Sequence, residues 1–146
     1  MTTAWSHLPN AKHIDRVIAS VKAHPEAWDA ALFQLQTAAL EAALEAALEA
    51  AWEAAWDQAR EVAKAQARDE AWRAARYAAR DEVLVEAWNA AGGAVLALVA
   101  WDHSAKFLDM TANELKMWSI LSEDPAAILL LLAVVAFAKI AEMELV

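Results

Sequence analysis

One stretch of the chain gathers side chains that could bind an anion. At spacings typical of one helix face, the sequence places Asp69, Trp72, Arg73, Arg76 and Arg80. On an α-helix these positions fall within about 100° of arc. Guanidinium groups bind phosphate or carboxylate through paired hydrogen bonds, and an indole stacks on a nucleobase. The set therefore suits a small nucleotide-like anion, although it also suits a packing face whose arginine stems cover Trp72 and pair with Asp69 or with the upstream acids.

His103 is a further candidate for ligand binding. Val99 precedes it by four residues and Phe107 follows it by four, so one continuous helix would place the imidazole on an apolar face. A histidine in that position either contacts a ligand or serves as a hydrogen-bonded core residue. Both interpretations stay open at the level of sequence.

A row of acidic residues precedes the arginines. At four-residue spacing the chain carries Glu41, Glu45, Glu49, Glu53, Asp57 and Glu61. Glu45, Glu49 and Glu53 are the candidate partner-binding residues, and an ordinary solvated face is the alternative. Each pair of like charges four residues apart destabilises a helix by a few tenths of a kcal/mol, unless basic residues pair with them. The arginines downstream could do so in an antiparallel return or from a neighbouring subunit.

The familiar patterns of enzymes and metal sites are absent from the sequence. It has no glycine-rich phosphate loop, no nucleophile elbow, no histidine pair at helical metal-binding spacing and no cysteine. We therefore predict a protein that is not an enzyme and uses no metal or cofactor. The formal net charge of -9 argues against binding to nucleic acid or to an anionic membrane surface.

The elements that must position these residues lie mostly in one stretch, Glu26–Ala91, which contains neither glycine nor proline. It repeats with a period of four, so each repeat drifts by about 40° around a helix and no single face stays apolar. One straight helix of this length would span about 100 Å, whereas the radius of gyration of a compact domain of this size is near 15 Å. We predict breaks near Gln34–Thr37, with Thr37 capping the next helix, and around Lys64–Asp69.

Local signals mark the first helix. Asn10 is a fair N-cap for a helix that runs to about Ala23, and His24-Pro25 ends it, because the residue before proline is pushed out of the helical region. One apolar face is predicted from Ile14, Val17, Ile18 and Val21. Trp5 and Leu8 are candidate anchors for the preceding segment.

Other signals organise the last third of the chain. Gly92-Gly93 predicts either a turn or a close helix contact, followed by an apolar segment from Ala94 to about Leu108. Thr111 and Glu114 match the capping box that opens a helix. Asp124-Pro125 supplies a cap and a first helical residue for the last helix.

The whole chain is predicted to be all-α, because no strand-like alternation occurs. Its 146 residues fit one domain, comprising an N-terminal arm and helix (1–24), long alanine-rich helices (25–91) and core helices (92–146). Alanine faces permit close helix approach, and eight tryptophans need covering, so we expect a helical bundle that forms homo-oligomers.

The location of the protein is predicted from its segments. The N-terminus lacks the basic start and apolar run of a secretory signal. The apolar run Pro125–Ala138 is shorter than the roughly 18–20 residues of a spanning helix, so it is read as a core helix. We expect a cytoplasmic protein without a membrane partner.

Two stretches lie on either side of the alanine-rich repeats: Leu8–Asp15 leading to His24–Ala31, and Ala100–Asp102 running to Leu108–Met110. Together with the repeats between them, they resemble small uncharacterised helical proteins of tailed bacteriophages. The resemblance implies a setting in the host cytoplasm and interference with host defence. Its first form would be sequestration of an anionic nucleotide immune signal. The alternatives are an inhibitor or immunity protein that binds a host protein through its acidic face, and a self-assembling helical scaffold.

Overall fold

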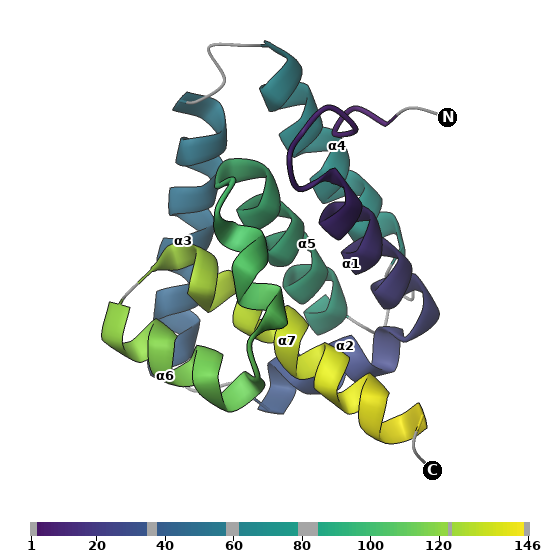
Figure 1. Cartoon of the computed structure of the whole chain (residues 1–146), viewed down its shortest axis with the longest axis vertical. Coiled ribbons are helices and arrows are strands. Elements are labelled where there is room, and N and C mark those ends of the chain that lie inside the picture. The colour runs from purple at the N-terminus through teal and green to yellow at the C-terminus, as the bar shows by residue number, and fades with distance from the viewer. Residues whose placement is uncertain (1–2, 35–37, 58–61, 79–84, 123, 145–146) are drawn as a thin grey trace.

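The computed structural model describes residues 3–34, 38–57, 62–78, 85–122 and 124–144. Within these ranges it consists of helices joined by short turns and contains no strand, which confirms the all-α prediction (Figure 1). In chain order the helices are α1 (Ala11–Ala23), α2 (Pro25–Gln34), α3 (Ala38–Asp57), α4 (Val62–Ala78), α5 (Val85–Ala100), the 3-10 helix η1 (Ser104–Asp109), α6 (Ala112–Ser122) and α7 (Pro125–Glu144). The homo-oligomer stays a prediction, because the structure contains one chain.

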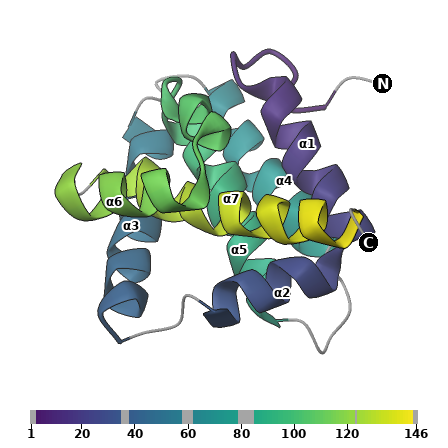
Figure 2. The same cartoon turned by 60° about the horizontal axis from the view of Figure 1, so that its bottom comes forward.

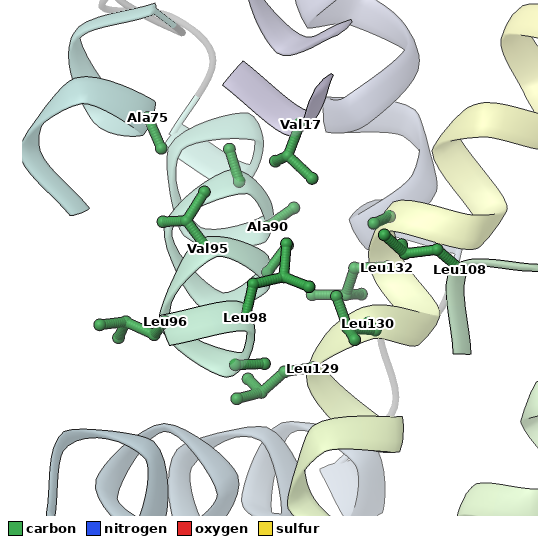
Figure 3. Close-up of a cluster of buried hydrophobic side chains, with 14 of the residues drawn as sticks. Val17, Ala75, Ala90, Val95, Leu96, Leu98, Leu108, Leu129, Leu130 and Leu132 are labelled. Carbon is green, nitrogen blue, oxygen red and sulfur yellow. The ribbon is translucent and has the colours of Figure 1, made fainter. Parts of the chain in front are cut away.

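Helix α5 forms the centre of the bundle. It contacts α1, α2, α3, α4 and α7, and every residue from Ala90 to Ala100 is buried. A helix buried on all sides must be apolar on all sides, as this segment is. Helix α7 crosses α5 (Figure 2), and Leu98 gathers with Leu129, Leu130 and Leu132 in one cluster (Figure 3).

Helix α1 has the predicted bounds and the predicted buried face. It ends at Ala23, before the His24-Pro25 pair, and Ile14, Val17 and Val21 are buried, whereas Ile18, the fourth residue of the predicted face, is half-buried. The anchor before it is also found, since the Trp5 indole nitrogen donates a hydrogen bond of 2.9 Å to the Asp15 carboxylate. The N-terminal segment is therefore tied to the outer side of α1.

The side chain of Asn10 does not cap α1 as predicted. It stands at the N-cap position without a side-chain cap bond, and its amide instead donates to the carbonyls of Leu98 at 3.0 Å and Trp101 at 3.2 Å. The buried Ser104 hydroxyl donates to the Ala97 carbonyl at 3.0 Å. The last carbonyls of a helix lack partners within it, so these two side chains stabilise the C-terminal end of α5.

The long repetitive stretch forms separate helices. The first break lies where it was predicted, between Gln34 and Ala38, although Thr37, the predicted cap, lies outside the described residues. The second prediction is wrong, because Lys64–Asp69 lies inside α4 and α3 has already ended at Asp57. A further helix end, at Ala78, was not predicted. A repeat with uniform helix propensity carries no local signal for these ends, so packing against α5 selects them.

Gly92 and Gly93 lie inside α5 and mark a close helix contact, one of the two predicted possibilities. The boundary expected between the alanine-rich helices (25–91) and the core helices (92–146) therefore falls within α5. The apolar segment expected over Ala94–Leu108 is divided, since α5 ends at Ala100 and η1 begins at Ser104.

The predicted signals of the last two helices are confirmed. Thr111 and Glu114 form the reciprocal capping box, with Thr111 N donating to Glu114 Oε1 at 3.3 Å and Glu114 N donating to Thr111 Oγ1 at 3.2 Å. Asp124 Oδ1 accepts a 2.9 Å hydrogen bond from Ala126 N at the start of α7. Each pair satisfies amides that have no partner within the helix.

Helix α7 is longer than the apolar run suggested. By length and composition alone, Pro125–Glu144 could cross a membrane, with a mean hydropathy of 2.3 over its most apolar window. In this structure 61% of that window is buried, where α7 contacts α2, α3, α5 and α6. The prediction of a core helix is confirmed for the fold seen here.

Candidate functional site

Two tryptophans join α3 to α4. The rings of Trp52 and Trp72 meet edge to face, with centroids 5.3 Å apart and planes inclined by 63°. The buried residues around them are small: Ala47 and Ala51 on α3, and Ala67, Ala71 and Ala75 on α4. Because alanine fills little space, the two indoles complete the packing between these helices.

Gly92 of α5 makes room for the Trp72 ring. A Cβ atom at Gly92 would lie 2.4 Å from Cζ3, 2.7 Å from Cε3 and 2.9 Å from Cη2 of Trp72. Side chains do not approach so closely, so only glycine allows the indole edge to rest on the α5 backbone. The position of Trp72 therefore depends on α3 and α5 together.

Two arginines flank the tryptophan pair. The Arg76 guanidinium lies 5.4 Å from the Trp72 ring centroid, and the Arg68 guanidinium lies 5.0 Å from that of Trp52. We call the series Arg76, Trp72, Trp52 and Arg68 the Arg-Trp ladder. Arg68 also pairs with Asp69 at 2.8 Å between Nε and Oδ1, so this carboxylate is already engaged by the ladder.

The solvent-facing arc of α4 carries Arg73, Arg76 and Tyr77, all of them exposed. Around the helix, Arg73 lies about 60° from Arg76 and about 40° from Tyr77. Arg73 forms no ion pair with any residue that the structure describes. Arg80, the last predicted member of the set, lies outside the described residues.

The arrangement agrees in part with each of the two sequence interpretations. Trp72 and Arg76 do meet, as predicted. Trp72, however, is engaged by Trp52, Gly92 and Arg76, which is the packing role that the sequence left open. Asp69 is paired, but with Arg68 on the ladder. Arg73 and Arg76 are the two predicted arginines that the structure describes, and both are exposed.

His103 does not lie on an apolar helix face, and that prediction is wrong. The helix carrying Val99 ends at Ala100, and His103 stands at the start of η1, where its side chain is 49% exposed. Its Nε2 lies 3.4 Å from Asp124 Oδ2, and its ring meets Phe107 edge to face at 6.1 Å. The four-residue spacing of Val99, His103 and Phe107 does not place them on one face, because the backbone is not α-helical between Ala100 and Ser104.

Glu45, Glu49 and Glu53 are all exposed on α3. They span about 80° of arc, opposite the buried Ala47 and Ala51. None of the three forms an ion pair with a residue that the structure describes, so the expected pairing with downstream bases is not found there. The contacts seen between α3 and α4 use the Arg-Trp ladder instead.

Within the described ranges, no group of three or more His, Asp or Glu residues is placed to hold an ion. Sequence reasoning did not single out Tyr77, which is exposed on the same arc. Its four-residue spacing from Arg73 could have indicated this position, but the larger indole of Trp72 was preferred as the aromatic candidate.

The comparisons with known proteins found no relative. No family model matches the sequence, and no curated protein or solved structure is significantly similar to it. The function is therefore inferred from the geometry of the two exposed faces.

Proposed function

We propose that the protein is a non-enzymatic binder of a small nucleotide-like anion, and that Arg73 and Arg76 hold the anionic group. Both guanidinium groups are exposed on one arc of α4. Two such groups about 60° apart on a helix can converge on one phosphate or on neighbouring phosphates. This proposal retains the arginine part of the sequence prediction and removes the stacking role of Trp72.

The stack of Arg76 on Trp72 is the observation that carries the proposal. A guanidinium that packs over an indole loses side-chain freedom but keeps its positive charge. Trp72 itself is held by Trp52 and by the Gly92 backbone, so Arg76 rests on a fixed platform. Ordering a side chain before binding lowers the entropic cost of the complex.

The surrounding charges support the same site. Asp69 is engaged by Arg68 at 2.8 Å, which leaves the charge of Arg73 without a neutralising ion pair among the described residues. Because the chain as a whole has a net charge of -9, binding must depend on this local field. Affinity should therefore fall as salt screens it.

The phage resemblance supplies a setting for this activity. A phage protein in the host cytoplasm that binds a nucleotide immune signal would lower its free concentration without any chemical step. The absence of a recognisable catalytic pattern in the sequence is compatible with such sequestration.

Thermal denaturation with added ligands tests the proposal. The panel contains inorganic pyrophosphate, a cyclic dinucleotide and ADP-ribose. A ligand at one hundred times its Kd stabilises the folded state by about 2.7 kcal/mol, which raises Tm by roughly 5–10 °C for a chain of this size. At least one of these anions should produce such a shift.

The double variant Arg73→Ala, Arg76→Ala should lose the shift. The matched control is Lys12→Ala, Lys22→Ala, which removes two exposed positive charges from α1 and should keep it. Replacing both arginines by lysine should give a weaker response, because lysine keeps the charge but not the planar fork. An unchanged Tm across the whole panel would contradict the proposal.

A second candidate function is favoured by the acidic face of α3. Glu45, Glu49 and Glu53 are exposed together and form no ion pair within the described part of the chain. Three uncompensated carboxylates on one rigid helix face suit a basic protein surface. In this second proposal the protein is an inhibitor or immunity protein that blocks a host protein.

Charge reversal distinguishes the second candidate from the first. The variant Glu45→Lys, Glu49→Lys, Glu53→Lys should weaken capture of a basic partner from bacterial lysate, whereas nucleotides should have no effect on capture. A matched reversal at Asp109, Glu142 and Glu144, which are exposed elsewhere, should leave capture unchanged. Equal effects of the two reversals would show that total charge, and not the α3 face, is responsible.

A further inference from the structure

Trp72 cannot serve as an open stacking platform. Its ring edge rests on the Gly92 backbone, where a Cβ would lie 2.4 Å away. The Arg76 guanidinium lies over the ring at 5.4 Å, and Trp52 meets it at 5.3 Å. An incoming base would have to displace Arg76 or separate α3 from α4.

Tyr77 is the aromatic residue that the same arc presents to solvent. Tyr77 is 68% exposed, which is unusual for a large aromatic residue. It follows Arg73 by four residues, so the two are neighbours along the helix surface. It lies about 40° from Arg73 and about 100° from Arg76 around the axis.

The arc is also polarised from one side to the other. Arg76 and Arg73 occupy one side, whereas Tyr77 and Glu70 occupy the other, with Glu70 about 60° from Arg73. A negative group is attracted to the arginine side and repelled from Glu70. A ligand with a phosphate at one end and a flat ring at the other fits this order, with the ring directed toward Tyr77.

We propose that Tyr77 stacks on the ring of the ligand and makes the Arg73–Arg76 site selective for aromatic anions, that is, for nucleoside phosphates over simple phosphates. This inference rests on the proposed function, because it concerns the same site. It assigns affinity to the arginines and selectivity to Tyr77. Stacking of a base on an aromatic side chain changes affinity by about ten-fold or more.

Calorimetric titration with two probes tests the inference. Inorganic pyrophosphate carries the anion without a base, and ADP carries a comparable anion with one. The wild-type protein should bind ADP at least about ten-fold more tightly than pyrophosphate. In Tyr77→Leu that ratio should fall toward one through loss of ADP affinity, while pyrophosphate affinity stays unchanged.

The controls separate this inference from the proposed function. Tyr77→Phe keeps the ring and should keep the ratio, and circular dichroism should show the same helix content in all variants because Tyr77 is exposed. A wild-type ratio that survives in Tyr77→Leu overturns the stacking role while leaving the arginine site intact. Failure of the wild-type protein to bind either probe overturns the proposed function itself, and this inference with it.

Discussion

The pair α5 and α7 and the pair α3 and α4 are packed in different ways. Helix α7 buries a continuous aliphatic run that includes Leu129–Leu132, and it lies against the fully buried part of α5. The described buried residues of α3 and α4 are all alanines, and the large groups between those two helices are Trp52 and Trp72. One pair is held by many aliphatic contacts and the other by a few aromatic ones.

This difference separates the residues that stabilise the fold from those available for binding. A buried leucine removes more apolar area from water than a buried alanine, at about 0.8 kcal/mol for each CH2 group. Alanine packing places the backbones of α3 and α4 close to α5 while their outer arcs carry charge. Changes on those arcs should therefore alter binding with little effect on stability.

The largest expected effect is a truncation within the aliphatic pair. Leu130 is completely buried, so Leu130→Ala should lower the free energy of unfolding by about 2–5 kcal/mol. The matching truncation in the other pair, Ala71→Gly on α4, should cost about 0.5–1 kcal/mol from backbone entropy, plus the loss of one methyl group. Urea denaturation measures both, and equal losses would contradict the comparison.

A smaller loss is expected at the end of α5. Asn10 donates to two carbonyls there, one buried and one partly buried, and Asn10→Ala leaves both acceptors without this donor. The free energy of unfolding should fall by about 1–3 kcal/mol. The control Asn113→Ala, at an exposed position of α6, should stay within about 0.5 kcal/mol of wild type. Similar values for the two variants would show that the Asn10 amide does not stabilise α5.

The two glycines of α5 should respond differently to alanine. In Gly92→Ala the new methyl group meets the Trp72 ring, and displacing that ring costs roughly 1–3 kcal/mol, against a gain of up to about 1 kcal/mol in helix propensity. In Gly93→Ala the nearest atom is a Leu129 methyl carbon at 3.1 Å, so a shift of that side chain by a few tenths of an ångström should offset the gain in helix propensity and keep stability near that of wild type. Thermal denaturation compares the two variants, and a more stable Gly92→Ala would contradict the close contact with Trp72.

The smallest effects on stability are expected on the outer arc of α4. Arg73→Ala should change the free energy of unfolding by less than about 0.5 kcal/mol. Arg76→Ala should cost slightly more, about 0.5–1 kcal/mol, because it removes the stack on Trp72. Each should nevertheless weaken pyrophosphate binding by about ten-fold or more, since a charged hydrogen bond is lost. A large loss of stability in Arg73→Ala would place that side chain among the packing residues.

Much of the fold was predictable because its signals are local. The His24-Pro25 stop, the capping box of Thr111 and Glu114, and the cap at Asp124 each depend on residues within a few positions of one another. Their geometry is therefore encoded in short stretches of chain. The first break, after Gln34, was likewise marked by a local loss of the alanine repeat.

The candidate site was only partly predictable. The spacing of Arg73 and Arg76 was sufficient to place them on one arc. It could not show that α5 would present a glycine to Trp72, because those residues are 20 positions apart in the sequence and meet only when α4 packs on α5. We consequently propose Tyr77, in place of Trp72, as the residue that stacks on a ligand. His103 was misplaced for a similar reason, since the helix that was to carry it ends at Ala100.

By itself, the sequence determined that this chain is helical, where several helices begin and end, and which arginines share a face, because helix propensity, capping and spacing act over a few residues. The tertiary structure decided which tryptophan is enclosed, which helix Asn10 caps and where the alanine repeat is interrupted. These outcomes depend on contacts between distant segments. Because the repeat has nearly the same side chains in every turn, its sequence does not specify these contacts, and packing around α5 determines them.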